Sequence, residues 1–182
     1  MSRLVPTALL LLIGCAAPSR VELLSFADPH FPERYSFTAR ECAQWTDAGG
    51  DLHVAASALR LGDDDAGRAV SQLLHIHVFW RPLPGKTPSN STATDAVLRY
   101  VVQTPEGTFV YAGTGFVWTR KPRFGPFRVD LERGELRLIA STPGAEDVLG
   151  EMRISGSLYP SRDAAAAVGM IRSADEADGA AR

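Results

Sequence analysis

Alternation of apolar and polar residues with a period of two dominates the chain from about residue 34 onward. Successive side chains of a β-strand point to opposite faces of a sheet, so this period is typical of strands with one buried face. Within residues 70–80, one face would carry only apolar side chains: Leu74, Ile76, Val78 and Trp80. The other face of this segment would carry Leu73, His75, His77 and Phe79. We therefore predict a mainly β protein in which residues 70–80 form a central strand.

Turn residues divide the alternating region into segments of strand length. Breaks rich in glycine, proline or aspartate lie at 47–51, 62–67, 81–94 and 105–107, and Arg133-Gly134 predicts a further tight hairpin. The strands expected between these breaks are 35–45, 52–61, 70–80, 96–104, 108–118, 127–132, 135–141 and 152–158. About eight short antiparallel strands predict an antiparallel β-sandwich, with an open barrel as the alternative, because strand order is not visible in a sequence.

A short C-terminal helix is expected after the last strand. Ser161 can cap its amino terminus, and Asp163 would lie in the first turn, where a carboxylate complements the helix dipole. The helix would cover 164–172, with a buried stripe of Ala164, Val168 and Ile171. The chain becomes acidic beyond Ser173, and acidic residues are unfavourable at the carboxyl end of a helix, so we expect a frayed tail.

Length and composition suit one folded domain. The chain has 182 residues, of which 45% are hydrophobic and 22% charged, as in ordinary globular proteins. Its formal net charge is −2, so no overall basic field attracts nucleic acid. We predict no nucleic-acid partner.

The amino terminus predicts export. Residues 1–3 carry one positive charge, and 4–13 form a mostly apolar run that is shorter than the roughly 20 residues needed to cross a bilayer. This composition is typical of a removable leader. The run ends in Leu12-Ile13-Gly14-Cys15.

These last four residues resemble the lipobox of bacterial lipoproteins, in which a branched residue, a small or branched residue and a small residue precede a cysteine. The resemblance implies cleavage after Gly14 and a mature chain that begins at Cys15, carrying a thioether-linked diacylglycerol and an acylated amine. Two or three acyl chains make a firm anchor, whereas one chain holds only marginally. Lipoproteins sorted to the outer membrane lack Asp directly after the cysteine, and Ala16 is similar to them in this respect. The resemblance therefore favours the outer membrane, at its periplasmic face or the cell surface, over the inner membrane. The alternative is an ordinary secretory leader that is cut near Ala16-Ala17.

Four segments follow from these patterns. Residues 1–14 would be a signal peptide, 15–33 the lipid attachment and tether, 34–160 the β domain, and 161–182 the C-terminal helix and frayed tail. Acylation of Cys15 would leave Cys42 as the other cysteine, so no disulfide is expected. We interpret Cys42 as a buried or half-buried structural thiol.

Three histidines form a candidate metal site. His75 and His77 are two residues apart on one predicted strand, so their rings would share a face about 7 Å apart. Such a pair can present two imidazoles to a Zn or Cu ion, with His53 of the neighbouring strand or Cys42 as a third ligand. The alternative is that the rings are structural and hydrogen-bond to neighbours or water, in which case the chain has no cofactor.

A basic cluster lies close to aromatic residues in the second half of the chain. Its cations are Arg120, Lys121, Arg123 and Arg128. The aromatic residues are Trp118, Phe124 and Phe127. We interpret the cluster as a solvated loop, and contact with lipid headgroups is the alternative.

The functional expectation rests mainly on the leader, because no catalytic motif is evident. We expect an envelope lipoprotein, held on a membrane by its acyl chains, whose β domain binds a ligand or an envelope protein or cell-wall partner without catalysis. The alternative is a periplasmic metal-handling lipoprotein that uses His75 and His77. A further alternative is an enzyme of an unrecognised class. The long loop 81–94 could serve any of these functions.

Overall fold

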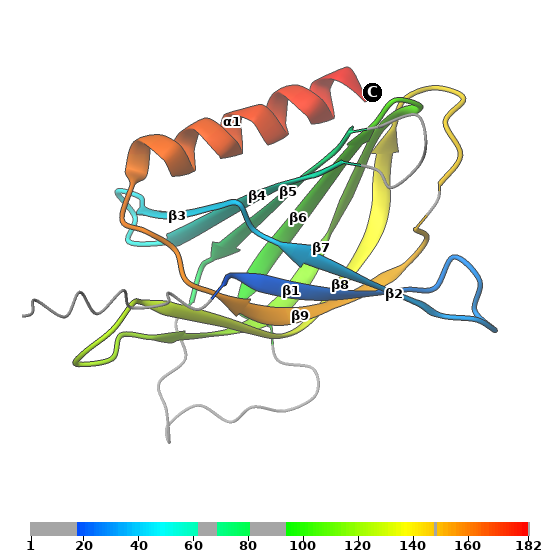
Figure 1. Ribbon diagram of the computed structural model, residues 1–182. Coiled ribbons are helices and arrows are strands. Elements are labelled where there is room, and N and C mark those ends of the chain that lie inside the picture. The colour runs from blue at the N-terminus through cyan, green and yellow to red at the C-terminus, as the bar shows by residue number, and fades with distance from the viewer. Residues whose placement is uncertain (1–17, 62–68, 81–93, 148, 182) are drawn as a thin grey trace, which may run out of the picture.

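The computed structural model describes residues 18–61, 69–80, 94–147 and 149–181 (Figure 1). These residues form nine β-strands and one α-helix, which confirms the expected mainly β class with a C-terminal helix. The strands are β1 Arg20–Ser25, β2 Glu33–Thr38, β3 Glu41–Thr46, β4 Leu52–Leu61, β5 Ala69–Val78, β6 Ala96–Thr104, β7 Gly107–Arg120, β8 Arg128–Ser141 and β9 Met152–Leu158. The helix is α1 Ala164–Ala180.

All nine strands belong to one antiparallel sheet that is curled into a half-barrel (Figure 1). The strand order is β2-β1-β9-β8-β7-β6-β5-β4-β3. A single curled sheet corresponds to the open-barrel alternative rather than to a sandwich of two sheets. β1 lies between β2 and β9, so part of the segment 15–33, predicted to be a tether, belongs to the sheet.

The two edge strands, β2 and β3, are consecutive in the chain and are separated by Ala39 and Arg40. Ala39 N donates to Ser19 O at 2.9 Å, and Arg40 N donates to Ser57 O at 2.8 Å. The chain therefore passes from edge strand β2, beside β1, to edge strand β3, beside β4, within two residues. This short connection holds the two edges of the sheet close together. The prediction of one continuous strand over 35–45 is wrong, because this bend also exchanges the faces of the two halves.

The core fills the concave face of the sheet. Phe37 of β2 contacts Tyr100 of β6 edge to face, with ring centroids 6.3 Å apart. These strands are five positions apart in the sheet, so the contact requires the curl. Large side chains that are almost fully buried occupy this space: Phe37, Leu74, Ile76, Leu98, Tyr111, Leu131, Ile154 and Leu158. The predicted core face of 70–80 is confirmed at Leu74, Ile76 and Val78. It is wrong at Trp80, because β5 ends at Val78 and Trp80 is 49% exposed.

Helix α1 lies on the convex face, across β3 to β7 (Figure 1). Its small side chains allow close approach to the sheet: Ala167 and Met170 pack near Ala43 and Ala55. Farther along, Ala174, Ala177 and Ala181 pack near Val101 and Val110. Asp163, rather than the predicted Ser161, caps the helix by accepting from Ala166 N at 3.0 Å. Ser161 is held instead by β3, where Gln44 N donates to Ser161 O at 2.8 Å.

Two predictions about the helix are wrong. The buried residues are Ala167, Met170, Ala174, Ala177 and Asp178, whereas Val168 of the predicted stripe is 44% exposed. The predicted fraying beyond Ser173 does not occur either, since the helix continues to Ala180. Arg99 of β6 forms ion pairs with Asp175 and Asp178. This tertiary contact offsets the unfavourable position of acidic residues at a helix carboxyl end.

The hairpin predicted at Arg133-Gly134 is also wrong, because β8 runs through this position with a bulge between Leu131 and Gly134. A Cβ atom at Gly134 would lie 2.4 Å from Leu98 Cδ1 and 2.5 Å from Ile154 Cγ2. This glycine therefore provides room for core side chains rather than a turn. The hairpin around 105–107 is confirmed in a tighter form, since Thr104 pairs with Gly107 and two residues connect the strands.

Candidate functional site

The strand register brings the three predicted histidines together on the convex face. His53 of β4 lies directly opposite His77 of β5, and Trp45 of β3 lies opposite His53. His75 belongs to the same face because it is two residues before His77. The prediction that His53, His75 and His77 are neighbours is therefore consistent with the described geometry.

The rings of this histidine cluster are nearly parallel. His53 stacks on His77 with centroids 4.4 Å apart and on Trp45 with centroids 4.9 Å apart. The centroids of His53 and His75 are 5.4 Å apart, with 19° between the ring planes. Cross-strand packing of flat rings of this kind stabilises neighbouring strands and fixes the ring orientations.

Hydrogen bonds link the cluster to two carboxylates of the loop between β3 and β4. His53 Nδ1 lies 3.2 Å from His75 Nε2, and His53 Nε2 lies 3.4 Å from Asp47 Oδ2. His77 Nε2 lies 2.9 Å from Asp51 Oδ2. A neutral His53 that donates from Nε2 to Asp47 accepts at Nδ1, so His75 Nε2 is then the donor between the two rings.

The loop 47–51 is a rigid support for these carboxylates. Asp47 N donates to Asp51 O at 3.0 Å, and Asp51 N donates to Asp47 Oδ1 at 2.9 Å. Gly50 has φ of 92°, a left-handed conformation that favours glycine. The Asp51 backbone N–H, with help from His53, lowers the pKa of Asp47 below its usual value. The Asp47 carboxylate is therefore ionised and accepts from His53.

Burial, reinforced by the imidazoles of His53 and His77, lowers the pKa of His75 to about 4. A lowered histidine pKa means that the neutral ring is the native form at physiological pH. A neutral imidazole is the form that binds a metal ion. At His75, proton competition with a metal would therefore be weak above about pH 5.

The cluster has two of the features of a histidine metal site. Two nitrogen ligands at about 2.0 to 2.1 Å from a tetrahedral Zn lie about 3.3 Å apart, close to the 3.2 Å between His53 Nδ1 and His75 Nε2. Carboxylates that accept from the distal N–H of a ligand, as Asp47 and Asp51 do here, commonly orient such rings. The third ring is stacked rather than convergent, and within the described ranges no group of three or more ligand side chains surrounds one point.

Sequence reasoning missed Trp45, Asp47 and Asp51. The period-two pattern places residues on a face, but it does not tell which loop atoms return to that face. One usable signal was present, because two aspartates flank the turn of a hairpin, and a histidine, the second residue of the next strand, follows the second aspartate by two residues. Cys42, the other ligand considered, faces the core side, and burial raises the pKa of its thiol to about 11.

A buried carboxylate lies at the start of β6. Asp95 is completely buried, and its Oδ1 accepts from Val117 N at 2.7 Å. Within the described part of the chain, its Oδ2 has no hydrogen-bond partner. Burial raises the pKa of Asp95 to about 6. The bond to Val117 gives this carboxylate a structural role in holding β6 against β7.

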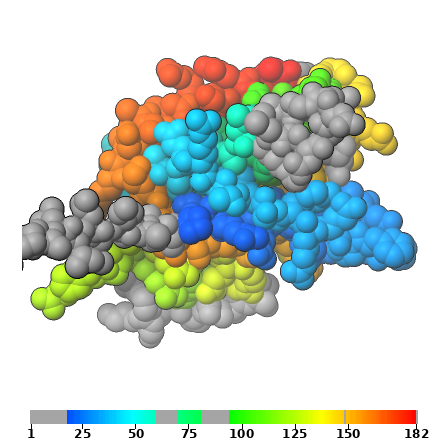
Figure 2. Space-filling model, viewed as in Figure 1, coloured from blue at the N-terminus to red at the C-terminus, as the bar shows by residue number. Residues whose placement is uncertain are grey.

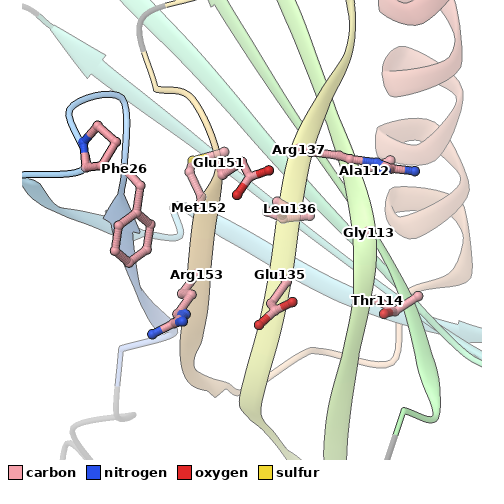
Figure 3. Close-up of a pocket in the computed structure, with 11 residues that line it drawn as sticks. Phe26, Ala112, Gly113, Thr114, Glu135, Leu136, Arg137, Glu151, Met152 and Arg153 are labelled. Atoms are coloured by element: carbon pink, nitrogen blue, oxygen red, sulfur yellow. The ribbon is translucent and has the colours of Figure 1, made fainter. Parts of the chain in front are cut away.

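A second surface feature is an open groove of about 810 Å³ on the convex face of β7, β8 and β9 (Figure 3). Figure 3 shows Glu135 on β8, Glu151 just before β9, and Arg153 on β9 beside Phe26. The Arg153 guanidinium lies 5.2 Å from the centre of the Phe26 ring. Charges of both signs and an aromatic ring suit a polar binding surface better than a cavity for an apolar ligand.

The remaining predicted site residues lie outside the described residues: Gly14, Cys15 and loop positions 81–93. In the ranges that the structure covers, no helix combines the length and the apolar character needed to cross a membrane.

Comparison with known proteins finds no family model that matches the chain, and no significant match to a curated protein or to a solved structure. The class of the protein is therefore defined by its own fold: a curled antiparallel half-barrel with one helix on its convex face.

Proposed function

We propose that this chain is an exported lipoprotein of a bacterial envelope, anchored through acyl chains on Cys15, whose β domain binds another envelope component without catalysis. The observation that carries the proposal is Leu12-Ile13-Gly14-Cys15 at the end of an apolar run. The filled concave face favours binding on the convex face or at the loops, where the charged groove lies.

The start of the sheet supports a short tether. Ser19 O accepts from Ala39 N, and Ser19 Oγ accepts from Tyr159 N at 2.8 Å. Ser19, which these hydrogen bonds hold to the sheet, is four residues after Cys15. A protein held this closely would keep one end of its sheet near the lipid surface and present the rest to partners.

The test is to compare the wild-type chain with Cys15→Ser after crosslinking in cells and extraction from membranes. We expect the wild-type chain to be processed, labelled by fatty acid and crosslinked reproducibly to one envelope protein or wall polymer. Cys15→Ser should remain an uncleaved, unlabelled precursor. Normal processing of Cys15→Ser would favour the ordinary leader cut near Ala16-Ala17, and the absence of any crosslinked component would contradict the binding role.

We propose metal handling at the histidine cluster as a second function, because of the spacing of His53 Nδ1 and His75 Nε2 and their carboxylate partners. A Zn or Cu ion would replace the hydrogen-bonding proton between these two nitrogens and be bound by both. Rotation of the His77 side chain would supply a third ligand. This function requires a different ring arrangement from the stacked one, so it predicts that metal changes the ring packing.

Calorimetric titration of the full chain with Zn and with Cu tests this second function. The double variant His75→Gln/His77→Gln should bind at least about 100-fold more weakly than the wild-type chain, since two of three ligands are lost. His30→Gln is the matched control, because His30 lies exposed in the turn between β1 and β2. Equal affinity of the double variant and the wild-type chain would leave the histidines as structural residues.

A further inference from the structure

The loop between β7 and β8 leaves the sheet at the same end as the chain that leads back to Cys15. Arg20 of β1 pairs with Ser157, Ser157 pairs with Asp130, and Asp130 pairs with Trp118. Neighbouring strands in this row are antiparallel, so the amino-terminal end of β1 and the carboxyl end of β7 point in the same direction. In Figure 1 the lime hairpin of β7 and β8 projects on the side where the blue strand β1 begins.

The tip of this hairpin, residues 119–128, is basic and carries an exposed aromatic ring. It contains four cations and no acidic residue: Arg120, Lys121, Arg123 and Arg128. Phe124 is 83% exposed, and the Arg123 guanidinium lies 5.6 Å from the centre of its ring. Basic residues around an exposed aromatic side chain are typical of segments that lie in the interface of an anionic membrane.

The base of the tip is held by a carboxylate. Asp130 Oδ1 accepts from Arg128 Nε at 2.6 Å, and Asp130 Oδ2 lies 3.3 Å from Arg120 Nε. The carboxylate balances one of the four positive charges, and its contacts join the two sides of the hairpin at its base. Lys121 and Arg123 lie at the apex, next to Phe124. Figure 2 shows the hairpin projecting from the body of the molecule.

Distance also favours contact between the tip and a membrane. Cys15 precedes Arg20 by five residues, which span at most about 18 Å when fully extended. β5 runs parallel to β7, so its last residues reach the same end, and there Phe79 and Trp80 are 46% and 49% exposed. Tryptophan is enriched where proteins meet lipid headgroups.

We propose that the tip 119–128 rests on the anionic headgroup layer of the membrane to which Cys15 is anchored. This inference rests on the proposed lipid anchor and adds the orientation of the domain to it. Acyl chains and a basic patch together make a stronger attachment than either alone. The tip would hold the end of the half-barrel against the lipid and leave the groove over β7, β8 and β9 accessible to partners.

The test uses the acylated full chain in vesicles, with a nitroxide label on Phe124→Cys and, as the matched control, on Phe31→Cys. Phe31 is 75% exposed in the turn between β1 and β2, at the opposite end of β1. Cys42 is turned toward the core and its thiol pKa is raised to about 11, so it should react poorly with the label, and the wild-type chain measures this background.

In vesicles containing phosphatidylglycerol, the label at position 124 should be at least about fivefold less accessible to an aqueous nickel chelate than the label at position 31. Lys121→Gln/Arg123→Gln should reduce this protection, since each charge contributes about fivefold to binding an anionic surface. Equal exposure of both labels on an acylated chain would overturn the docking while leaving the anchor intact. Equal protection in vesicles without anionic lipid would show that anionic headgroups do not hold the tip, and would also overturn the proposal. A chain without acylation, detected by mass, would remove the proposed anchor itself.

Discussion

Gly113 marks the closest approach between the backbones of β7 and β8. A Cβ atom at this position would lie 1.7 Å from the carbonyl oxygen of Glu135. The obstacle is backbone, so no side-chain rotation relieves the clash. Gly113→Ala should therefore lower the free energy of unfolding by at least about 3 kcal/mol, measured by urea denaturation.

Gly169→Ala is the matched control for Gly113→Ala. Gly169 lies inside α1, where an added Cβ meets nothing within 4 Å. Gly169→Ala should raise the free energy of unfolding by about 0.5 to 1 kcal/mol, because alanine restricts the unfolded chain and favours helix. Similar effects of the two substitutions would contradict the account of close backbone packing at Gly113.

The face of the sheet on which a side chain lies could be predicted from the sequence where the residue belongs to a regular strand. Period-two parity places His75 and His77 on one face and Leu74 and Ile76 in the core. Parity failed within 35–45: a continuous strand would put Ala43 on the same face as Phe37, but Phe37 lies in the core and Ala43 packs against α1. The bend at Ala39 and Arg40, which exchanges the faces, depends on closure of the whole sheet. The hydrogen bond from His77 to Asp51 depends on loop conformation, which residue patterns do not encode.

Arg99 of β6 holds the acidic carboxyl end of α1 through two ion pairs. Arg99→Leu should remove both ion pairs of Arg99, one of which is made to the buried carboxylate of Asp178. We expect a loss of about 1 to 3 kcal/mol and faster amide hydrogen exchange over 174–181. Arg172→Leu is the control, since Arg172 is an exposed residue of the same helix. Unchanged exchange in Arg99→Leu would show that apolar packing alone orders this end.

The ends of strands could be predicted where turn residues coincide with a break in the alternation of apolar and polar residues. The hairpin between β6 and β7 has Pro105 and Glu106 as its connection, and strand alternation stops on both sides. Gly134 produced a false turn, because a glycine that accommodates Leu98 and Ile154 looks the same in a sequence as a glycine in a hairpin. The acidic end of α1 was misjudged for a related reason: Arg99 is 76 residues before Asp175.

The mainly β class of the domain could be predicted from the sequence, whereas the single curled sheet could not. The same strands could form a sandwich of two packed sheets or one sheet curled into a half-barrel. The two folds differ in which strands pair and in how close the edge strands come to each other. Here the β2 and β3 edges are joined by two residues, and β1 pairs with β9 at the far end of the chain. These long-range pairings orient the end near Cys15, the hairpin tip and the groove relative to one another.

The intact mass of the protein extracted from membranes tests whether the domain is anchored through Cys15. We expect a mature chain of 168 residues, that is 182 less the 14 of the leader, with a diacylglycerol and an acyl group on Cys15. Cys15→Ser should retain the mass of the unprocessed chain. An unmodified mature chain that begins after Cys15, or identical processing of Cys15→Ser, would contradict the lipid anchor.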